Sequence, residues 1–459
     1  MHSASAPAYG RAVPSAPAAG GPSRLIGGRR RPALGVLAPL LSVLLVAGQP
    51  RPAAAGGDGT GDCYSVTTCY TPQQIEVAYG IWPLLLQGFD GRGETVVMPE
   101  LAEQQLDPPM VSDIRQDLAG FDQRFGLPAA RLEVTTRFAP GASRWLSFYE
   151  ETLDVEMVHA IAPSAAIDVV LFSLSATASA GSVISNLTDM VRLGTAHGDV
   201  ISMSEGIGEN CAAGPDVSRL HAALRAADLH HVTVIASSGD TGPVGGPCLG
   251  QFVTPGAVPP RAPSLPASDP LVLAVGGTSL TASHQDGGYT RETAWSLPLE
   301  NRGLSTLASG GGFSHRFPRP AYQNGVPGIG GARGVPDVAA DASGHTGMAL
   351  VISNGSGGYE IGAAGGTSAA APFWAGLIAV ADQFAGHDLG FVNPALYCIG
   401  RSPVYHQAFH DVTTGNSTVM VAPNAVPGYR AGPGWDPVTG WGTPSAQAMV
   451  PLLAGYACY

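Results

Sequence analysis

Six short runs of apolar and β-branched residues alternate along the chain with segments of helical length. Runs of four to seven such residues are typical of strands that are buried on both faces of a sheet. Their alternation with helices predicts an α/β fold with a doubly wound, mostly parallel sheet flanked by helices. The expected strands are 94–99, 166–172, 200–203, 232–236, 271–275 and 348–352, and the expected helices are 148–161, 181–195, 217–229 and 369–384.

Ser368 stands at the start of the last expected helix, in the segment Gly-Gly-Thr-Ser-Ala-Ala-Ala-Pro-Phe-Trp-Ala-Gly at 365–376. The small residues before it allow a substrate to approach the backbone, and the positive end of a helix stabilises negative charge. Pro372 is expected in the first helical turn, where its missing N–H has no intrahelical partner. We interpret Ser368 as a nucleophile whose own N–H can face a developing oxyanion. The alternative is an ordinary helix cap.

The composition excludes several kinds of catalyst. All 23 basic residues are Arg, so the chain has no Lys for a Ser-Lys dyad, a Schiff base or a phosphate-binding loop. The 459 residues are 45% hydrophobic and 13% charged, which is typical of a globular protein with a sizeable core. The formal net charge of −12 argues against a nucleic-acid partner.

The N-terminal 55 residues are typical of a secretory signal. They contain no acidic residue, and Arg29–Arg31 precede an apolar run at 33–48 and three alanines that end at Ala55. The run has 16 residues, fewer than the roughly 20 that span a bilayer. We predict that 1–55 is a signal region, that cleavage takes the net charge from −12 to −18, and that the protein is secreted without stable membrane association. A retained anchor is the alternative.

The remaining chain shows no repeat, long linker or change of composition. We therefore expect a short extension at 56–69 and one catalytic domain at 70–459. Six scattered cysteines without a Cys-x-x-Cys pair favour disulfides over zinc. The preferred pairing, among 15 that six cysteines permit, is Cys63–Cys69, Cys211–Cys248 and Cys398–Cys458.

No histidine stands where a subtilisin-type triad needs one. His197 directly precedes an expected strand and is predicted to lie in a turn. His159 lies deep in the expected helix 148–161, where it is predicted to make a buried hydrogen bond. A different group must therefore activate Ser368.

The same helix carries Glu150 and Asp154, which are four residues apart and so lie on one face. Leu153, Val155 and Val158 indicate that the helix is buried. Two close carboxylates in a partly buried place repel each other, so one of them keeps its proton to higher pH. The alternative is a solvated acidic face.

This chain resembles the sedolisin family of serine-carboxyl peptidases, which keep a subtilisin-like three-layer fold but use Glu, Asp and Ser as their catalytic residues. The resemblance covers nearly all of the chain after the signal. It rests on Glu150 and Asp154 in a Glu-x-x-Leu-Asp pattern, on Ser368 in Gly-Thr-Ser, and on the segments 237–242, 266–268, 275–278, 309–314 and 336–341.

The resemblance implies a role for each site residue. Glu150 accepts the Ser368 proton, Asp154 orients Glu150, and Asp240 completes an oxyanion hole with the Ser368 amide. Asp240 must then be protonated while Glu150 is ionised, which predicts an acidic pH optimum. Glu100, at the end of the first expected strand, matches a family glutamate that extends this network.

The resemblance also implies one structural calcium ion. Taken alone, the segments 409–416 and 431–436 predict only turns, although their oxygen atoms suit a hard cation. The matching family positions bind calcium through two aspartates and three main-chain carbonyls, within a region at about 405–445. They are Asp411, Val412, Gly432, Gly434 and Asp436.

Two features depart from the family pattern. Family precursors usually carry a large inhibitory prodomain, whereas about 15 residues separate Ala55 from the start of the expected domain at Tyr70. Glu205 stands where several members have Trp, which can alter the outer proton network or the substrate pocket.

We therefore expect a secreted, calcium-stabilised, monomeric serine-type endopeptidase that acts on protein or peptide substrates at acidic pH. The alternatives are a tripeptidyl-peptidase of the same family and a catalytically inactive binding protein on the same fold.

Overall fold

The structure is a computed structural model. It describes residues 69–102, 113–137, 149–173, 179–246, 248, 260–297, 307–354, 357–421 and 424–455. The predicted signal region 1–55, and the predicted extension 56–69 apart from Cys69, lie outside these residues. None of the helices in the described ranges is both long enough and apolar enough to cross a membrane.

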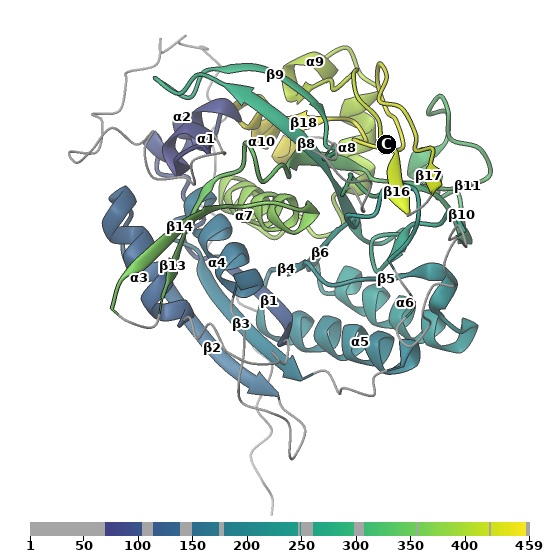
Figure 1. The fold of residues 1–459 in the computed structure, drawn as a ribbon, viewed down its shortest axis with the longest axis horizontal. Helices are drawn as coiled ribbons and strands as arrows, with labels where there is room; N and C mark the ends of the chain where they lie inside the picture. Colours follow the sequence, from purple (N-terminus) through teal and green to yellow (C-terminus); the bar gives the residue numbers. More distant parts are fainter. Residues whose placement is uncertain are drawn as a thin grey trace, which may run out of the picture. The chain divides into compact units, whose positions relative to one another are not determined.

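A sheet of eight strands forms the centre of the fold (Figure 1). Seven strands form a continuous row in which all neighbours are parallel, and β9 pairs antiparallel with β8. This arrangement confirms the predicted α/β fold with a mostly parallel sheet. In order across the row the strands are β12 (Val338–Asp341), β8 (Leu273–Ala282), β6 (Thr233–Ser237), β4 (Val200–Met203), β1 (Thr95–Ala102), β3 (Ala166–Ser173) and β2 (Arg131–Arg137), with β9 at Tyr289–Ala294.

Helices cover both faces of the sheet because its strands are apolar on both sides. In β1, Val96 and Met98 belong to one hydrophobic cluster and Val97 and Leu101 to another, as the alternation of side chains along a strand requires. The first cluster includes side chains of α4 (Tyr149–Ile161) and α7 (Thr367–Ala385). The second includes those of α5 (Ala180–His197) and α6 (Gly214–Leu229), which lie side by side (Figure 1). The result is a three-layer sandwich.

Shorter elements surround these layers. The remaining helices are α1 (Pro72–Ala78), α2 (Trp82–Leu86), α3 (Ile114–Phe125), α8 (Asn393–Gly400), α9 (Tyr405–Ala408) and α10 (Ala446–Gly455), with 3-10 turns η1 (Glu209–Cys211) and η2 (Ala321–Gln323). The two-stranded pairs are β5 (Ile207–Gly208) with β7 (Ser264–Leu265), β10 (Gly312–Pro318) with β11 (Ala332–Val335), β13 (Ala349–Ser353) with β14 (Tyr359–Ala363), β15 (Phe409–His410) with β18 (Thr443–Pro444), and β16 (Val419–Val421) with β17 (Asn424–Val426).

The predicted strand 348–352 does not join the central sheet. It forms β13, which pairs antiparallel with β14 and is buried because it packs against α3 and α4. The edge positions of the sheet belong instead to β2 and β12, which the sequence did not indicate. β2 is polar and largely exposed, and β12 is short with two alanines, so neither has an apolar β-branched run.

Helix α7 begins earlier than the sequence indicates. Its first residue is Thr367, so Pro372 lies in the second turn rather than the first. A proline there leaves the carbonyl of Ser368 without its helical donor. The Ser204 hydroxyl lies 3.4 Å from that carbonyl. His197, predicted in a turn, is instead the last residue of α5.

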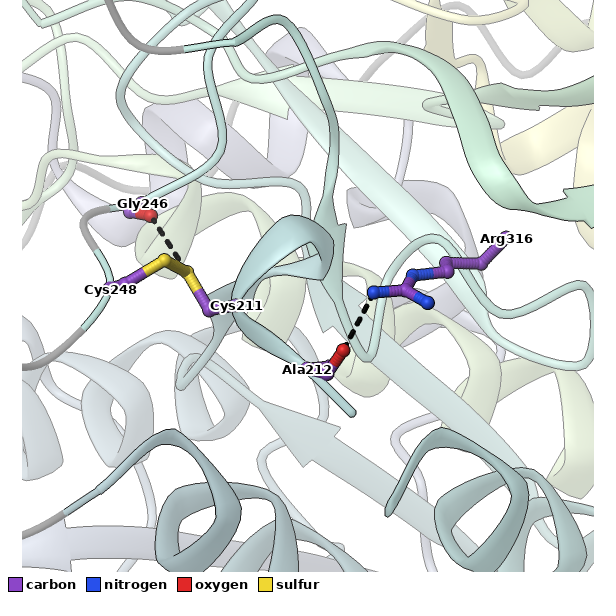
Figure 2. The surroundings of a disulfide bond; sticks show 5 residues. All are labelled: Cys211, Ala212, Gly246, Cys248 and Arg316. Carbon is purple, nitrogen blue, oxygen red and sulfur yellow. Dashed lines mark hydrogen bonds between the residues drawn. A yellow bond between two sulfur atoms is a disulfide. The ribbon is translucent and has the colours of Figure 1, made fainter. Parts of the chain in front are cut away.

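The predicted Cys211–Cys248 disulfide is formed (Figure 2). Cys69 and Cys398 are also disulfide-bonded. Cys63 and Cys458, their predicted partners, lie outside the described residues, so those two pairings stay predictions.

Candidate active site

Ser368 is the second residue of α7 and is half-buried at the carboxyl end of the central sheet. Gly366, just before the helix, has a φ of 81°, a conformation that residues with a side chain rarely adopt. A Cβ atom on Gly366 would also lie 2.6 Å from Oδ2 of Asp240. The small residues before Ser368 therefore allow the Asp240 carboxyl to lie against the start of the helix.

A cavity of about 400 Å³ opens beside Ser368. Its walls come from the start of α4, the segment after β4, the segment after β6 and the start of α7, as expected for a site at the carboxyl ends of parallel strands. Three of the four predicted catalytic residues line it: Glu150, Asp240 and Ser368. The other lining residues are Leu101, Tyr149, Glu151, Ser204, Glu205, Gly206, Ser237, Gly239, Thr241, Gly246, Ser264 and Thr367.

Asp154, the fourth predicted residue, lies one turn further along α4 and is fully buried behind the cavity. The Ser204 hydroxyl donates a hydrogen bond of 2.7 Å to its Oδ2 atom. Burial raises the pKa of Asp154 well above its ordinary value, and the negative charge of Glu150 raises it further. The structure therefore brings Glu150 and Asp154 close enough to influence each other's ionisation, as their spacing predicts.

Glu100 extends this carboxyl network from β1. It is buried, and its carboxyl lies close enough to that of Asp154 for the Asp154 charge to raise its pKa. Burial is the main cause that raises the pKa of Glu100, and the charges of Asp154 and Glu205 raise it further. Because two buried carboxylates this close repel each other, the pair favours holding a proton.

Glu205 adds a further negative charge at the cavity wall. It follows Ser204, the hydrogen-bond donor to Asp154, and its charge contributes to the raised pKa of both Glu100 and Asp154. Glu205, which departs from the family pattern, therefore belongs both to the carboxyl network and to the cavity wall.

Thr367 fixes the position of Asp240. Both its backbone N–H and its hydroxyl donate hydrogen bonds of 2.8 Å to Oδ1 of Asp240, and the hydroxyl also accepts one of 3.0 Å from the Gly239 N–H. Burial raises the pKa of Asp240, although the bonds from Thr367 lower it in part. The raised pKa extends to higher pH the range in which this carboxyl keeps its proton. The contact of Thr367 with Asp240 was not predicted from the sequence. The position of Thr367 directly before Ser368 was the one feature that could have indicated it.

No histidine lines the cavity among the described residues. His159 is fully buried on α4, and its Nε2 atom lies 2.9 Å from the carbonyl of Pro128 and 2.9 Å from Oδ1 of Asp122. These contacts confirm the predicted buried hydrogen bond. Among the described residues that line the cavity, the ionisable groups are therefore carboxyls and the phenol of Tyr149.

The segment around Gly246, at the rim of the cavity, is anchored covalently (Figure 2). Cys248 bonds to Cys211 at the end of η1, and the Cys211 sulfur lies 4.0 Å from the Gly246 carbonyl. On the other side of this turn, Arg316 donates a hydrogen bond of 2.6 Å to the carbonyl of Ala212. The disulfide therefore holds one wall of the cavity to the body of the protein.

The predicted calcium residues form two linked turns. The Asp411 carboxylate accepts a hydrogen bond of 3.1 Å from the Gly434 N–H, and Oδ2 of Asp436 accepts one of 3.1 Å from the Gly432 N–H. Among the described residues, no Arg or His forms an ion pair with either aspartate. Burial raises the pKa of Asp436 to about 6. Two carboxylates close to glycine-rich backbone, one of them buried without a cationic side chain, are a donor set that fits a hard cation.

Comparisons with known proteins agree with this architecture. The sequence model of the subtilase family matches residues 148–393. Kumamolisin from Bacillus sp. (strain MN-32) is 33% identical over 401 residues, which are 84% of this chain and 64% of that protein. Tripeptidyl-peptidase 1 from Macaca fascicularis is 29% identical over 357 residues, which are 73% of this chain and 57% of that protein. The chain thus spans less than two thirds of the length of either relative.

Among solved structures, the chain is similar to Pseudomonas sedolisin, a serine-carboxyl proteinase solved in complex with two molecules of pseudo-iodotyrostatin. The TM-score is 0.68 and the identity 26%, and the match covers 84% of this chain and 98% of that one.

Proposed function

Because this chain belongs to the sedolisin family of subtilisin-like serine-carboxyl peptidases, we propose that it is an endopeptidase that hydrolyses peptide bonds at acidic pH. The observation that carries the proposal is the shared cavity of Glu150, Asp240 and Ser368, with the buried carboxyl of Asp154 behind it. The nucleophile, a base and an acid thus come from three separate elements and face one space.

In the proposed reaction, Oγ of Ser368 attacks the carbonyl carbon of the scissile bond while Glu150 accepts the hydroxyl proton. The resulting oxyanion accepts hydrogen bonds from the Ser368 N–H and from protonated Asp240. Glu150 then gives its proton to the leaving amine, and an acyl-enzyme remains. A water molecule loses a proton to Glu150 and attacks the ester, after which Glu150 returns that proton to Ser368 as the acid product leaves.

The proposed pH range follows from the protonation states that this reaction needs. Glu150 must be ionised, whereas Asp240 must keep a proton. Burial raises the pKa of Asp240, so the two conditions overlap in mild acid and are lost as pH rises through that value. Asp154, which accepts a hydrogen bond from Ser204 and lies beside Glu100, is proposed to orient Glu150 and hold the shared proton.

We propose that one structural calcium ion is held by the carboxylates of Asp411 and Asp436 and the carbonyls of Val412, Gly432 and Gly434. When bound, it would supply positive charge to the buried Asp436 carboxylate and hold the two turns together. The proposal of a secreted monomer that acts on protein or peptide substrates rests on the sequence features of the N-terminal region and on the peptidase relatives.

A second candidate activity is the release of tripeptides from substrate N-termini, since tripeptidyl-peptidase 1 is among the relatives. Mass spectrometry of the products separates the two, because an endopeptidase releases fragments of varied length and a tripeptidyl-peptidase releases a series of tripeptides.

The deciding experiment measures cleavage of denatured protein from pH 3 to 8 with the wild type, Ser368→Ala and Glu150→Gln. We expect a maximum in acid and a loss of roughly 10⁴-fold or more in kcat/KM for Ser368→Ala. Activity of Ser368→Ala like that of the wild type would contradict the proposed nucleophile. A maximum near neutrality, or full activity of Glu150→Gln, would contradict the carboxyl mechanism.

A further inference from the structure

Four carboxyl groups meet at the amino end of the central sheet, on the opposite edge from the cavity. Glu94 directly precedes β1, and Asp199 directly precedes the neighbouring strand β4. Asp388 follows the C-terminus of α7, and Asp382 lies in the last turn of that helix. We call these four residues the amino-end cluster. They come from three separate parts of the chain, so the fold rather than a local motif brings them together.

The carboxylates of this cluster are spaced as the ligands of one metal ion. One oxygen atom from each of Glu94, Asp199 and Asp388 lies within 4.8 Å of the other two. Two oxygens on one calcium ion, each at about 2.3–2.6 Å, can lie no further apart than about 5 Å. Glu94 is buried, and Asp199 and Asp388 are half-buried, so these are not freely solvated surface carboxylates.

Asp382 is an independent sign of a missing ligand at this place. Its side chain is fully buried, and its Oδ1 atom accepts a hydrogen bond of 2.8 Å from the N–H of Leu389, the residue next to Asp388. Its Oδ2 atom has no hydrogen-bond partner among the described residues. Burial raises the pKa of this carboxyl, and the charges of Glu94, Asp388 and Asp199 raise it further, which places the carboxyl beside the other three.

The chain contains no lysine that could neutralise the negative charge of this cluster. Among the described residues, no Arg or His forms an ion pair with Asp382 or Asp388. The C-terminal carbonyls of α7 add negative potential at the same place, because a helix dipole is negative at that end. Carboxylates gathered at a helix C-terminus repel one another and are stabilised by a bound cation.

We propose that the amino-end cluster binds a divalent cation, for which calcium is the best fit. The ligands would be carboxylate oxygens of Glu94, Asp199 and Asp388, with Oδ2 of Asp382 facing them from the helix. Calcium accepts six to eight oxygen ligands in flexible geometry, whereas magnesium demands a near-ideal octahedron and keeps several waters. The ion would join the C-terminus of α7 to the first residues of β1 and β4. This site is distinct from the calcium turns at Asp411 and Asp436.

The test counts bound calcium on the full chain carrying Ser368→Ala, which prevents self-digestion and makes the result independent of the proposed activity. After removal of metal with a chelator, CaCl₂ is titrated calorimetrically at pH 6.5. We expect two ions per chain, and one ion after Asp388→Asn, whose side chain makes no hydrogen bond with described residues. Asp411→Asn should remove the other ion, and Asp388→Asn should leave that one in place.

The matched control is Asp189→Asn, which changes an exposed aspartate on α5 whose ion pair among the described residues is with Arg192. This variant should still bind two ions. Two ions in Asp388→Asn, or a single ion in the parent that Asp411→Asn removes, would overturn the proposal. If Asp388→Asn fails to fold, as judged by circular dichroism, crystals of the parent soaked in terbium chloride decide. An anomalous peak within about 2.6 Å of the cluster oxygens supports the site, and a map without such a peak overturns it.

Discussion

The two ends of α7 meet carboxyl groups in different ways. At its N-terminus, burial raises the pKa of both Glu100 and Asp154, so a proton can relieve the repulsion between these carboxyls. At its C-terminus, the side chains of the amino-end cluster converge with one oxygen of Asp382 unpartnered, and we propose that a metal ion relieves their repulsion. The comparison suggests two uses for carboxyls gathered at the ends of one helix: we propose acid-base chemistry at the N-terminus of α7 and cation binding at its C-terminus.

The strongest test of the N-terminal end is the replacement of Asp240. Asp240→Ala should lower kcat by roughly 10²–10³-fold, because it removes the proposed oxyanion donor. Asp240→Asn retains an oxygen that can accept the bonds from Thr367 and an N–H₂ that donates at any pH. Its activity should therefore exceed that of the alanine variant and extend to higher pH. Equal pH profiles for Asp240→Asn and the wild type would contradict a role for the Asp240 proton.

Another buried carboxyl, that of Asp341 at the end of β12, tests whether protons also stabilise the fold. Burial, with a contribution from Glu292, raises the pKa of Asp341 to about 7. An aspartate titrates near 3.9 in an unfolded chain, so the folded state holds the proton more tightly between these values. The contribution of Asp341 to the free energy of unfolding is fully present below about pH 4. It is lost as pH rises to about 7, and the loss is up to about 4 kcal/mol.

Asp341→Asn should therefore reduce the fall in Tm between pH 4 and pH 7. Its amide oxygen can still accept the bonds that Oδ1 receives from the N–H groups of Leu280 and Ser343. Thermal unfolding of the Ser368→Ala background at both pH values measures the effect. The same fall in Tm with and without the substitution would show that Asp341 does not hold its proton in the folded state.

The C-terminal end of α7 is tested by Asp382→Asn, whose effect should depend on calcium. In a chelator, the substitution removes a buried charge, so Tm should stay constant or rise. In millimolar calcium, the substitution removes a negative charge beside the bound ion. The rise in Tm that calcium causes should therefore be smaller by roughly 2–4 °C. If the substitution changes Tm equally in both conditions, the carboxyl of Asp382 does not contribute to cation binding.

Glu205→Gln should have the smallest effect. The negative charge of Glu205 raises the pKa of Glu100 and Asp154, so its removal should move the activity profile to lower pH by roughly 0.5–1 unit. The measurement is kcat/KM against pH. A changed KM with an unmoved profile would instead mean that Glu205 acts only on the substrate through the cavity wall.

Much of the fold could be predicted from local pattern. The strand 200–203 was predicted because it is buried and almost continuously apolar, and most of α4 was predicted because Leu153, Val155 and Val158 indicate a buried helix. β2 and β12 were missed because an edge strand needs few apolar residues, and the buried run at 348–352 was placed in the sheet although β14 and two helices cover it. The hydrophobic pattern of a segment indicates that the segment is buried, but not which strands or helices bury it.

The candidate site was likewise only partly predictable from local sequence patterns. The spacing of Glu150 and Asp154 was readable on one helix, and the resemblance supplied Asp240 and Ser368. The functions of these residues and the calcium ligands stay predictions. The contacts of Ser204 and Thr367 depend on the packing of distant segments, and the amino-end cluster draws on positions from 94 to 388, so no local pattern could reveal either.

In the proposed peptidase, the disulfide between Cys211 and Cys248 would affect substrate binding more than the chemical step. It secures the wall at Gly246, whereas Asp240 and Ser368 are positioned by hydrogen bonds and helix packing that need no covalent tie. In a thiol-rich medium the wall would loosen while the reacting groups kept their places. The affinity for a bound substrate would then fall before the rate of the chemical step did. The oxidation state of the surroundings would thus control substrate affinity.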